Sequence, residues 1–290
     1  MKTRYIFAAL AATLLLAGCF QDVHELDPSR NVGFVAPELS WANPADAGTD
    51  IHDLLVVVNS EEGAYSKHYS NVREFAREPL EVPAGESSIL FLANAGEADG
   101  YQLSGLPATK FTMAEMFLYY PLLSALMGHN CYMGSAEVMV GKNEFEAPIA
   151  PLKPVLPRIS LSMSNIPERA RVSVVLGNAA ASVRLNCGSK AGVEPASESL
   201  GNIELGDLDK GDIKTLVPPT VDGASTCDMT LSVTMPDGTK TVQLHAPRMD
   251  CGGEYSLSLD YKNLIIKMDV GSFIIENWDV EHSYDGRIYE

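Results

Sequence analysis

The chain has 290 residues, of which 46% are hydrophobic and 20% are charged, and its formal net charge is −17 at pH 7. Nucleic acid is excluded as a favourable partner, because its phosphate backbone and this acidic surface would repel each other. The length is large for one β-sandwich and sufficient for two domains with separate hydrophobic cores.

The N-terminus has the pattern of a lipoprotein signal peptide. Lys2 and Arg4 precede an apolar or small run at 6–16, and the run ends in Leu-Ala-Gly-Cys, with Gly18 before Cys19. The run is too short for a transmembrane helix, which needs about 20 apolar residues. The pattern predicts a secretory signal at 1–18, cleaved between Gly18 and Cys19, with lipid on Cys19.

Acyl chains on Cys19 are expected to hold the protein on a membrane, and each buried methylene contributes about 0.8 kcal/mol, so more than one chain gives stable attachment. The alternative is a secreted protein whose Cys19 is incidental. Loss of Lys2 and Arg4 with the signal lowers the formal charge from −17 to −19. The acidic stretch at 21–27 resembles a surface-export signal of Bacteroides-type lipoproteins, although it also fits an ordinary solvated linker. We expect an outer-membrane location, on the outer face.

Four further cysteines can form a disulfide in an exported protein. Three of them lie in the second half, which favours a bridge among Cys187, Cys227 and Cys251 over one to Cys131. Four cysteines allow three pairings, and the sequence does not choose between them. Free, buried thiols are the alternative. No CxxC spacing is present, so a zinc site is not expected.

The first half reads as a series of hairpins with no βαβ rhythm. The run Leu54–Val58 is rich in β-branched residues, as in a buried strand, and Ser60–Gly63 supplies a turn. The other expected strands are 31–41, 65–75, 79–82, 88–94 and 131–140.

One helix is expected in the first half. Thr112 and Glu115 have the spacing of a capping box before the apolar residues Met116 and Phe117, and Pro121 would end or kink the helix. Its apolar stripe is expected to face the core.

Four prolines between 148 and 157 predict a stiff, extended connector and therefore a domain boundary. After it, Ile159, Leu161 and Met163 alternate with serines, as in a half-buried strand. Asp237-Gly238 is a strong hairpin signal between strands at 229–235 and 241–245. Further strands are expected at 172–176, 183–185, 255–259, 264–266 and 273–278.

These patterns predict an all-β chain of two tandem β-sandwich domains, transthyretin-like or immunoglobulin-like, with one short helix in the first. The expected organisation is a signal peptide at 1–18, a flexible linker at 19–32, an N-terminal domain at 33–152 and a C-terminal domain at 153–290.

No catalytic motif accompanies these domains. The sequence contains no GxSxG, HExxH, GxGxxG or GxxxxGK[ST] pattern. His129 and Cys131 lie close along the chain, but a nucleophile and its base usually meet through the fold. We therefore expect no catalytic residues, no cofactor and no enzymatic activity.

Two weaker binding patterns have simpler explanations. Asp207, Asp209 and Asp212 make an acidic loop that departs from a calcium-binding frame, and a solvated loop is the favoured interpretation, with no metal expected. Trp41 and Trp278 could stack on sugars, but both lie in strand-like runs where core packing is favoured.

Several segments together resemble the fimbrillin-like and fimbrial-anchor lipoproteins of Bacteroides-type bacteria. The resemblance lies in a pattern of strands and turns, and only the lipobox is a specific motif. The segments are the lipobox at 16–19, the strand at 54–59, PAGESSILFLAN at 83–94, CYMGSAEVMV at 131–140, PVLPRISLSMSNIP at 154–167 and SFIIENWDV at 272–280.

This resemblance implies a cell-surface lipoprotein that is a structural, anchoring or accessory subunit of fimbriae, with a role in cell adhesion. It also implies assembly by β-strand addition, in which a sheet edge accepts an extended segment of a neighbouring subunit. Stalk subunits of the family lose an N-terminal strand after an arginine. Arg30 lies too near Cys19 for that release, although Arg73 and Arg77 are further candidates, and this departure favours an anchor or accessory subunit.

The alternative function is a surface lipoprotein that binds glycan for nutrient capture. It is motivated by the same lipid anchor and by tyrosines expected to be exposed, namely Tyr65, Tyr69 and Tyr101. The partners expected are thus a membrane, through Cys19, and other fimbrial subunits, with no nucleic acid.

Overall fold

The computed structural model describes residues 31–105, 116–120, 130–186, 192–205, 213–260, 265–270 and 273–275. The predicted signal peptide and Cys19 lie outside these ranges. Strands dominate the described residues, which confirms the prediction of an all-β fold. None of the described helices is long and apolar enough to cross a membrane.

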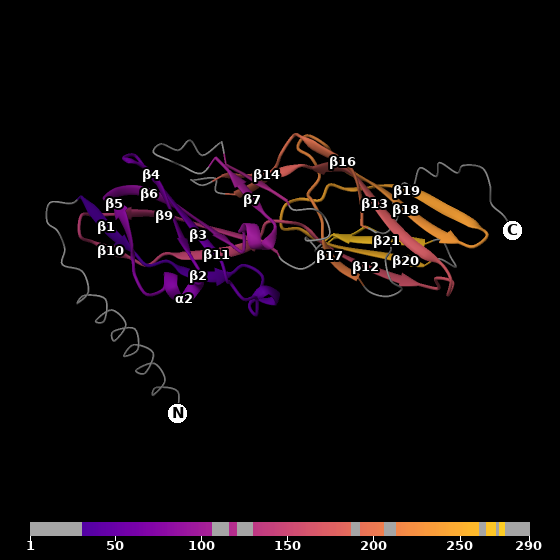
Figure 1. Ribbon diagram of the computed structural model, residues 1–290, viewed down its shortest axis with the longest axis horizontal. Helices are drawn as coiled ribbons and strands as arrows, with labels where there is room; N and C mark the ends of the chain where they lie inside the picture. The colour runs from indigo at the N-terminus through magenta and orange to yellow at the C-terminus, as the bar shows by residue number, and fades with distance from the viewer. Residues whose placement is uncertain are drawn as a thin grey trace, which may run out of the picture.

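The molecule is elongated, with strands of the first half at one end of the long axis and strands of the second half at the other (Figure 1). In the first half, a three-stranded sheet of order β10-β1-β5 packs on a six-stranded sheet of order β2-β11-β9-β6-β3-β4. The bounds are β1 Val32–Val35, β2 Glu38–Trp41, β3 Leu54–Ser60, β4 Gly63–Tyr69, β5 Leu80–Pro83, β6 Gly85–Ala93, β9 Tyr132–Val140, β10 Phe145–Glu146 and β11 Ile149–Pro154.

Strand β3 is buried on both faces, which explains its unbroken apolar run. Leu54, Val56 and Val58 point into the core between the two sheets. Leu55 and Val57 point to the opposite face and join a second hydrophobic cluster. Side chains of a strand alternate between faces, so a run without polar residues requires a covering layer on each side.

That second covering layer is a four-stranded sheet of order β15-β14-β8-β7. It packs Met116 and Leu118 of β8, and Val183 and Leu185 of β14, into the second cluster. The strands are β7 Gln102–Ser104, β8 Met116–Tyr119, β14 Ser182–Asn186 and β15 Gly192–Pro195. Because β8 and β14 pair across the boundary expected at 152/153, the two halves share this sheet and its core. The domain boundaries themselves stay a prediction.

The helix predicted around Met116 is wrong. Met116–Tyr119 is strand β8, in which Met116 and Leu118 are fully buried and alternate with more exposed neighbours. A period of two suits the sheet edge that β14 offers, and pairing there prevails over the capping-box pattern. Thr112 and Glu115 lie outside the described residues.

Short helices lie elsewhere in the first half. The expected strand at 65–75 ends at Tyr69, and the α-helix α2, Val72–Phe75, follows it. The Asn71 side chain caps α2 by accepting a hydrogen bond from the backbone N–H of Glu74. Two 3-10 turns are η1, Pro44–Asp46, and η2, Glu97–Asp99.

The proline-rich connector is also different from the prediction, because Ile149–Pro154 is strand β11 of the six-stranded sheet. It pairs in parallel with β2, and with β9 only through the registered pairs Lys153–Met133 and Pro154–Tyr132. Prolines lack a backbone N–H, and this short ladder with β9 tolerates that loss.

The second half is a sandwich of a five-stranded sheet, β17-β12-β20-β21-β22, and a four-stranded sheet, β16-β13-β18-β19. Ile159 and Leu161 of β12 point inward, as their alternation predicts, and the hairpin β18–β19 turns at Pro236-Asp237. The bounds are β12 Arg158–Ser164, β13 Arg171–Ala180, β16 Ser199–Glu204, β17 Ile213–Leu216, β18 Thr226–Met235, β19 Gly238–Pro247, β20 Glu254–Asp260, β21 Ile265–Val270 and β22 Phe273–Ile275.

Candidate functional site

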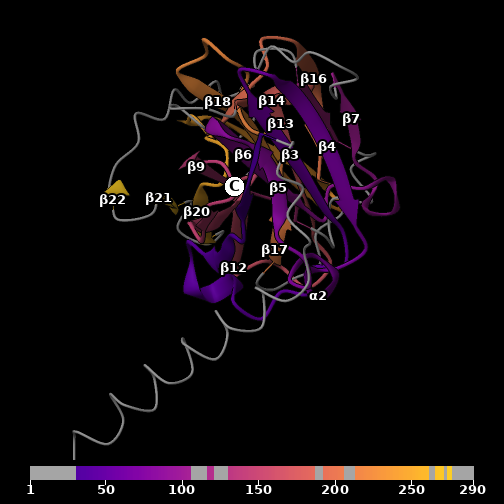
Figure 2. The same ribbon diagram turned by 90° about the vertical axis from the view of Figure 1, so that its left-hand side faces the viewer.

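The first sandwich has an open side where its two sheets end. Strand β4 is the last strand of the six-stranded sheet, and β5 is the last strand of the three-stranded sheet. Within the described residues, β4 pairs with β3 alone and β5 pairs with β1 alone. Viewed along the long axis, β4, β3 and β6 lie side by side, and β5 lies near them (Figure 2). Both strands therefore present backbone groups that a further strand can use.

A groove of about 400 Å³ runs along this open side. Leu80 and Val82 of β5 are buried at its base, and Tyr65 and Lys67 of β4 form the opposite wall. The groove thus combines an apolar floor with two sheet edges. An extended peptide could place backbone groups on an edge and alternate side chains on the floor.

Tyr65 bridges the groove. Its hydroxyl donates a hydrogen bond to the backbone carbonyl of Glu81 in β5, so a carbonyl on one sheet is satisfied by a side chain from the other. Burial raises the pKa of the Tyr65 hydroxyl well above its ordinary value, which keeps it protonated as a donor. The open edge of β5 is therefore partly covered in the isolated chain.

Lys67 also spans the gap. Its ammonium lies 3.9 Å from the Glu78 carboxylate and 4.8 Å from the centre of the Tyr69 ring. Both Lys67 and Glu78 are substantially exposed, so this ion pair contributes little stability. A lysine on an edge strand does, however, discourage unplanned strand pairing, because another chain would have to bury its charge.

The cysteines do not make a site in the described residues. Cys227 is buried in β18 and Cys251 is half-buried before β20, and both are free thiols, as is the buried Cys131. Cys227 and Cys251 are not bridged to each other in the structure, and the predicted bridge, which can also use Cys187, stays a prediction. Cys187, Gly18 and Cys19 lie outside the described residues.

The tyrosines offered for glycan capture are not exposed. Tyr69 and Tyr101 are 2% and 1% exposed, and Tyr65 is half-buried with its hydroxyl engaged. Trp41 packs against the first core and meets the Tyr132 ring edge-on at 4.9 Å, as the core interpretation predicts. The exposure expected of Tyr69 and Tyr101 is therefore wrong.

Other candidate residues lie outside the described ranges: His129, Trp278 and the aspartates at 207, 209 and 212. Within the described part of the chain, no group of metal-binding side chains gathers.

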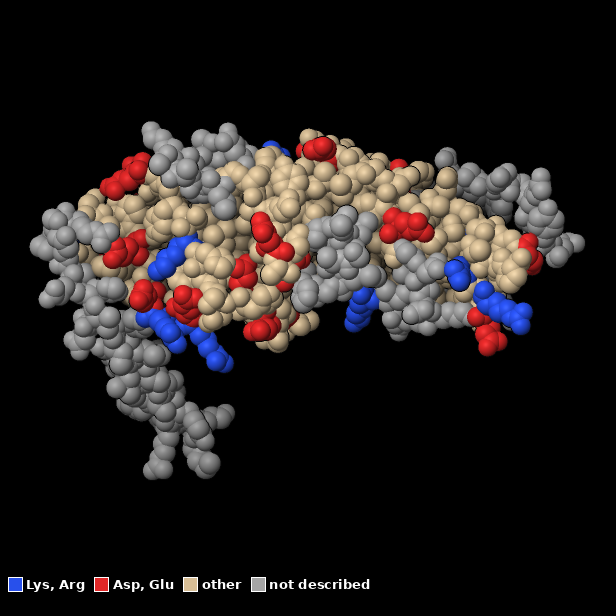
Figure 3. Space-filling view, in the orientation of Figure 1, with Lys and Arg blue, Asp and Glu red and all other residues tan. Residues whose placement is uncertain are grey.

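Acidic and basic side chains are interspersed on the face drawn in Figure 3, with no broad basic patch on it. Sequence reasoning missed the roles of Tyr65 and Lys67, although a lysine between two inward-facing tyrosines is a detectable sign of a protected edge.

Comparison with known proteins places the fold. The sequence matches no protein-family model, and no curated protein matches it significantly. Among solved structures, a candidate polysaccharide-binding protein from Bacteroides thetaiotaomicron is similar with a TM-score of 0.54 at 10% identity, covering 85% of this chain and 98% of that one. At this identity the likeness shows a shared fold alone.

Two fimbrial proteins of Porphyromonas gingivalis are further neighbours in structure. The anchor protein Mfa2 has a TM-score of 0.49 at 13% identity and covers 85% of this chain and 100% of its own. The tip protein Mfa3 has a TM-score of 0.49 at 11% identity, with coverages of 82% and 98%.

Proposed function

We propose that this chain is a cell-surface lipoprotein that serves as an anchoring or accessory subunit of fimbriae and joins its neighbours by β-strand addition. The observation that carries the proposal is the groove between β4 and β5, with an apolar floor and, among the described residues, a free strand edge on each side. Backbone pairing gives such a contact affinity, and alternate side chains in the groove give it specificity.

The expected occupant is an extended segment of a neighbouring fimbrial subunit. Strand β4 has seven residues, so at about 3.3 Å per residue its free edge offers about 23 Å of backbone. A donor must displace the Tyr65 hydroxyl from Glu81 and move Lys67 away from Glu78, and both contacts are weak enough to yield. The edge is thus covered before assembly and available during it.

Lipid on Cys19 supplies the attachment in this proposal, and about two acyl chains suffice for stable anchoring. Arg73 lies in α2 and Arg77 follows it, and both are exposed. A cut after either would separate β4 from β5 instead of releasing a terminal strand. The proposed subunit therefore keeps its N-terminus and its lipid.

Photo-crosslinking in intact cells tests the proposed edge. A photoreactive amino acid replaces the exposed Ser66 of β4. The matched control replaces the exposed Thr234 of β18, which pairs with β13 on one side and with β19 on the other. We expect the Ser66 probe to capture another β-rich surface subunit and the Thr234 probe to capture none. Equal capture at both positions, or no capture at Ser66 in cells that assemble fimbriae, would contradict strand addition at this edge.

Mass spectrometry of the crosslinked sample identifies the captured partner and also the mature N-terminus of this chain, which tests the anchor. A mature N-terminus that begins at a lipidated Cys19 supports an anchoring subunit, whereas an N-terminus created by cleavage after an arginine indicates a polymerising subunit. Recovery with a glycan transporter in place of fimbrial subunits would favour nutrient capture. Tyr69 and Tyr101 no longer support that alternative, because both are buried and cannot offer a surface to glycan.

A further inference from the structure

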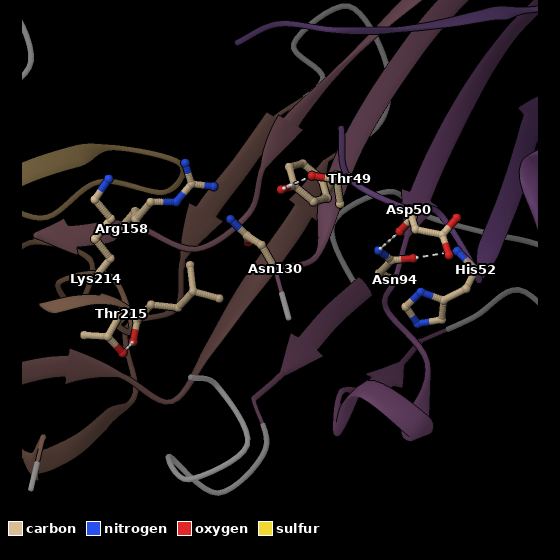
Figure 4. A pocket seen from close by; sticks show the side chains of 10 residues that line it. Thr49, Asp50, His52, Asn94, Asn130, Arg158, Lys214 and Thr215 are labelled. Atoms are coloured by element: carbon tan, nitrogen blue, oxygen red, sulfur yellow. Dashed lines mark hydrogen bonds between the residues drawn. The ribbon is translucent and has the colours of Figure 1, made fainter. Parts of the chain in front are cut away.

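A second hollow, distinct from the groove at β4 and β5, lies where the two halves of the chain meet. It has a volume of about 470 Å³, within the range of about 300–1,000 Å³ of small-molecule sites. Thr49, Asp50 and His52 contribute from the first half, and Arg158 and Lys214 from the second (Figure 4). We call this hollow the junction cleft.

The second-half wall of the junction cleft is held in place by hydrogen-bonded charges. The Arg158 guanidinium donates to the Asp46 carboxylate at 2.9 Å and to the Glu254 carboxylate at 3.2 Å. Asp46 is buried and also accepts a hydrogen bond from the Tyr132 hydroxyl at 3.1 Å. These bonds fix the plane of the guanidinium and leave it N–H donors to spare.

The first-half wall is equally ordered. The buried Asn94 amide donates to the backbone carbonyl of Asp50 at 2.9 Å and accepts from the backbone N–H of His52 at 3.1 Å. The His52 ring lies 3.0 Å from the buried Asp99 carboxylate. The segment that carries the exposed Asp50 side chain is therefore positioned before any ligand arrives, which lowers the entropic cost of binding.

Two polar side chains of the cleft, Lys214 and Asn130, have no ion-pair or hydrogen-bond partner, respectively, among the described residues. Lys214 is exposed and makes no ion pair with any described residue, although the protein is strongly acidic. Both polar atoms of the Asn130 amide are buried and have no hydrogen-bond partner among the described residues. Figure 4 places Asn130 between the two walls. Buried polar groups are normally paired, so this amide keeps unused hydrogen-bonding capacity beside the cleft, and the exposed Lys214 ammonium is the group that points to an anionic ligand.

We propose that the junction cleft binds an acidic saccharide residue, such as a uronic acid. One ring of such a sugar carries a carboxylate at one position and hydroxyl groups at the others. The carboxylate suits Lys214 and the spare donors of Arg158, while hydroxyl groups suit the Asp50 carboxylate and the Thr49 hydroxyl on the opposite wall. The separation of positive and acidic groups across the cleft sets the orientation of the ring.

The lining disfavours other classes of ligand. Leu216 is the one aliphatic residue among those that line the cleft in the described structure, so polar side chains supply most of the groups that would select a ligand. A neutral sugar would leave Lys214 without an ionic partner, and a nucleic acid would face the net negative charge of the chain. The proposal goes beyond assembly of fimbriae, because the cleft lies apart from β4 and β5.

The test measures binding of two named probes to the full chain in detergent by calorimetry. The probes are trigalacturonic acid and its neutral counterpart, galactotriose. Lys214→Gln and Asp50→Asn change exposed side chains of the cleft, and Lys153→Gln is the matched control, an exposed lysine that does not line it. Crosslinking at Ser66 in each variant reports independently on strand addition.

We expect trigalacturonic acid to bind at least tenfold more tightly than galactotriose, and the preference to weaken with added salt. Lys214→Gln should remove most of this preference, Asp50→Asn should weaken binding of both probes, and Lys153→Gln should change neither. Absence of binding of either probe up to millimolar concentration would overturn the proposal. An unchanged affinity in both Lys214→Gln and Asp50→Asn would do so as well.

Discussion

The Tyr65 hydroxyl donates a hydrogen bond to the backbone carbonyl of Glu81, and this bond joins the free edges of the two sheets of the first sandwich. Tyr65 belongs to β4 and Glu81 to β5, which are the end strands of different sheets. A side chain thereby satisfies a carbonyl that a further strand would otherwise use. The contact both protects the edge and marks the place where a donor strand would enter.

Tyr65→Phe should destabilise the protein by about 1 kcal/mol, because the Glu81 carbonyl loses its partner while the apolar ring remains. It should also speed uptake of a donor-strand peptide, since no bond has to be displaced. Urea unfolding and stopped-flow fluorescence measure the two effects. Tyr119→Phe is the control, because Tyr119 is 38% exposed. If Tyr119→Phe changes stability and the rate of peptide uptake as much as Tyr65→Phe does, the effect does not depend on the hydrogen bond to Glu81.

Arg158→Gln should cost about 2–3 kcal/mol, since it leaves the buried Asp46 carboxylate without its cationic partner. The loss should be smaller than for a fully buried pair, because the Arg158 side chain is 26% exposed. Thermal unfolding measures it, with the exposed Arg169→Gln as the control. An Arg158→Gln melting temperature equal to that of Arg169→Gln would show that the pair adds nothing to stability.

Leu185→Ala should destabilise the chain by about 2–5 kcal/mol, the usual cost of a cavity at a fully buried leucine. Because Leu185 of the second half packs with Leu55 and Leu90 of the first, the change should lower the stability of both halves together. Hydrogen exchange of β3 and β6 amides reports on the first half. Leu200→Ala, at a leucine that is 51% exposed, should have little effect. Unaltered exchange in β3 would contradict a shared core.

Burial raises the pKa of the Cys227 thiol from its ordinary value of 9.0 to about 11. Since the folded-state pKa is the higher one, the neutral thiol contributes stability that is fully present below pH 9 and is lost as the pH rises to 11. The free energy of unfolding should therefore fall less steeply over this interval in Cys227→Ala than in the natural chain. Parallel curves for the two proteins would exclude a contribution from this thiol.

Cys227 should also resist iodoacetamide at pH 8 in the folded protein and react in urea, because its thiol is free and buried. Peptide mapping after alkylation measures this. A protected Cys227 that becomes reactive only after reduction would instead reveal a disulfide.

Local sequence was sufficient to predict many of the strands. The apolar run Leu54–Val58 and the alternation at Ile159–Met163 each lie in the strand they predict. The hairpin predicted from Asp237-Gly238 is also present, with its turn one residue earlier, at Pro236-Asp237. Their signals depend on neighbouring residues alone, through β-branched side chains, period-two burial and turn geometry. The prediction around Met116 was wrong because a strand of the second half, β14, pairs with that segment, and no local pattern contains this information.

What only the tertiary structure decided is which distant residues share a surface. The sequence separates Tyr65 from Glu81 by a helix and a loop, and Asp50 from Lys214 by most of the chain, yet each pair lines one hollow. Sheet order and sandwich packing create these neighbours, because they depend on long-range strand pairing. The sequence alone was sufficient to predict the all-β class and sets the acidic charge, and it predicts the lipobox at Cys19. Composition, hydrophobic period and a contiguous motif are properties of neighbouring residues, so they do not depend on the fold.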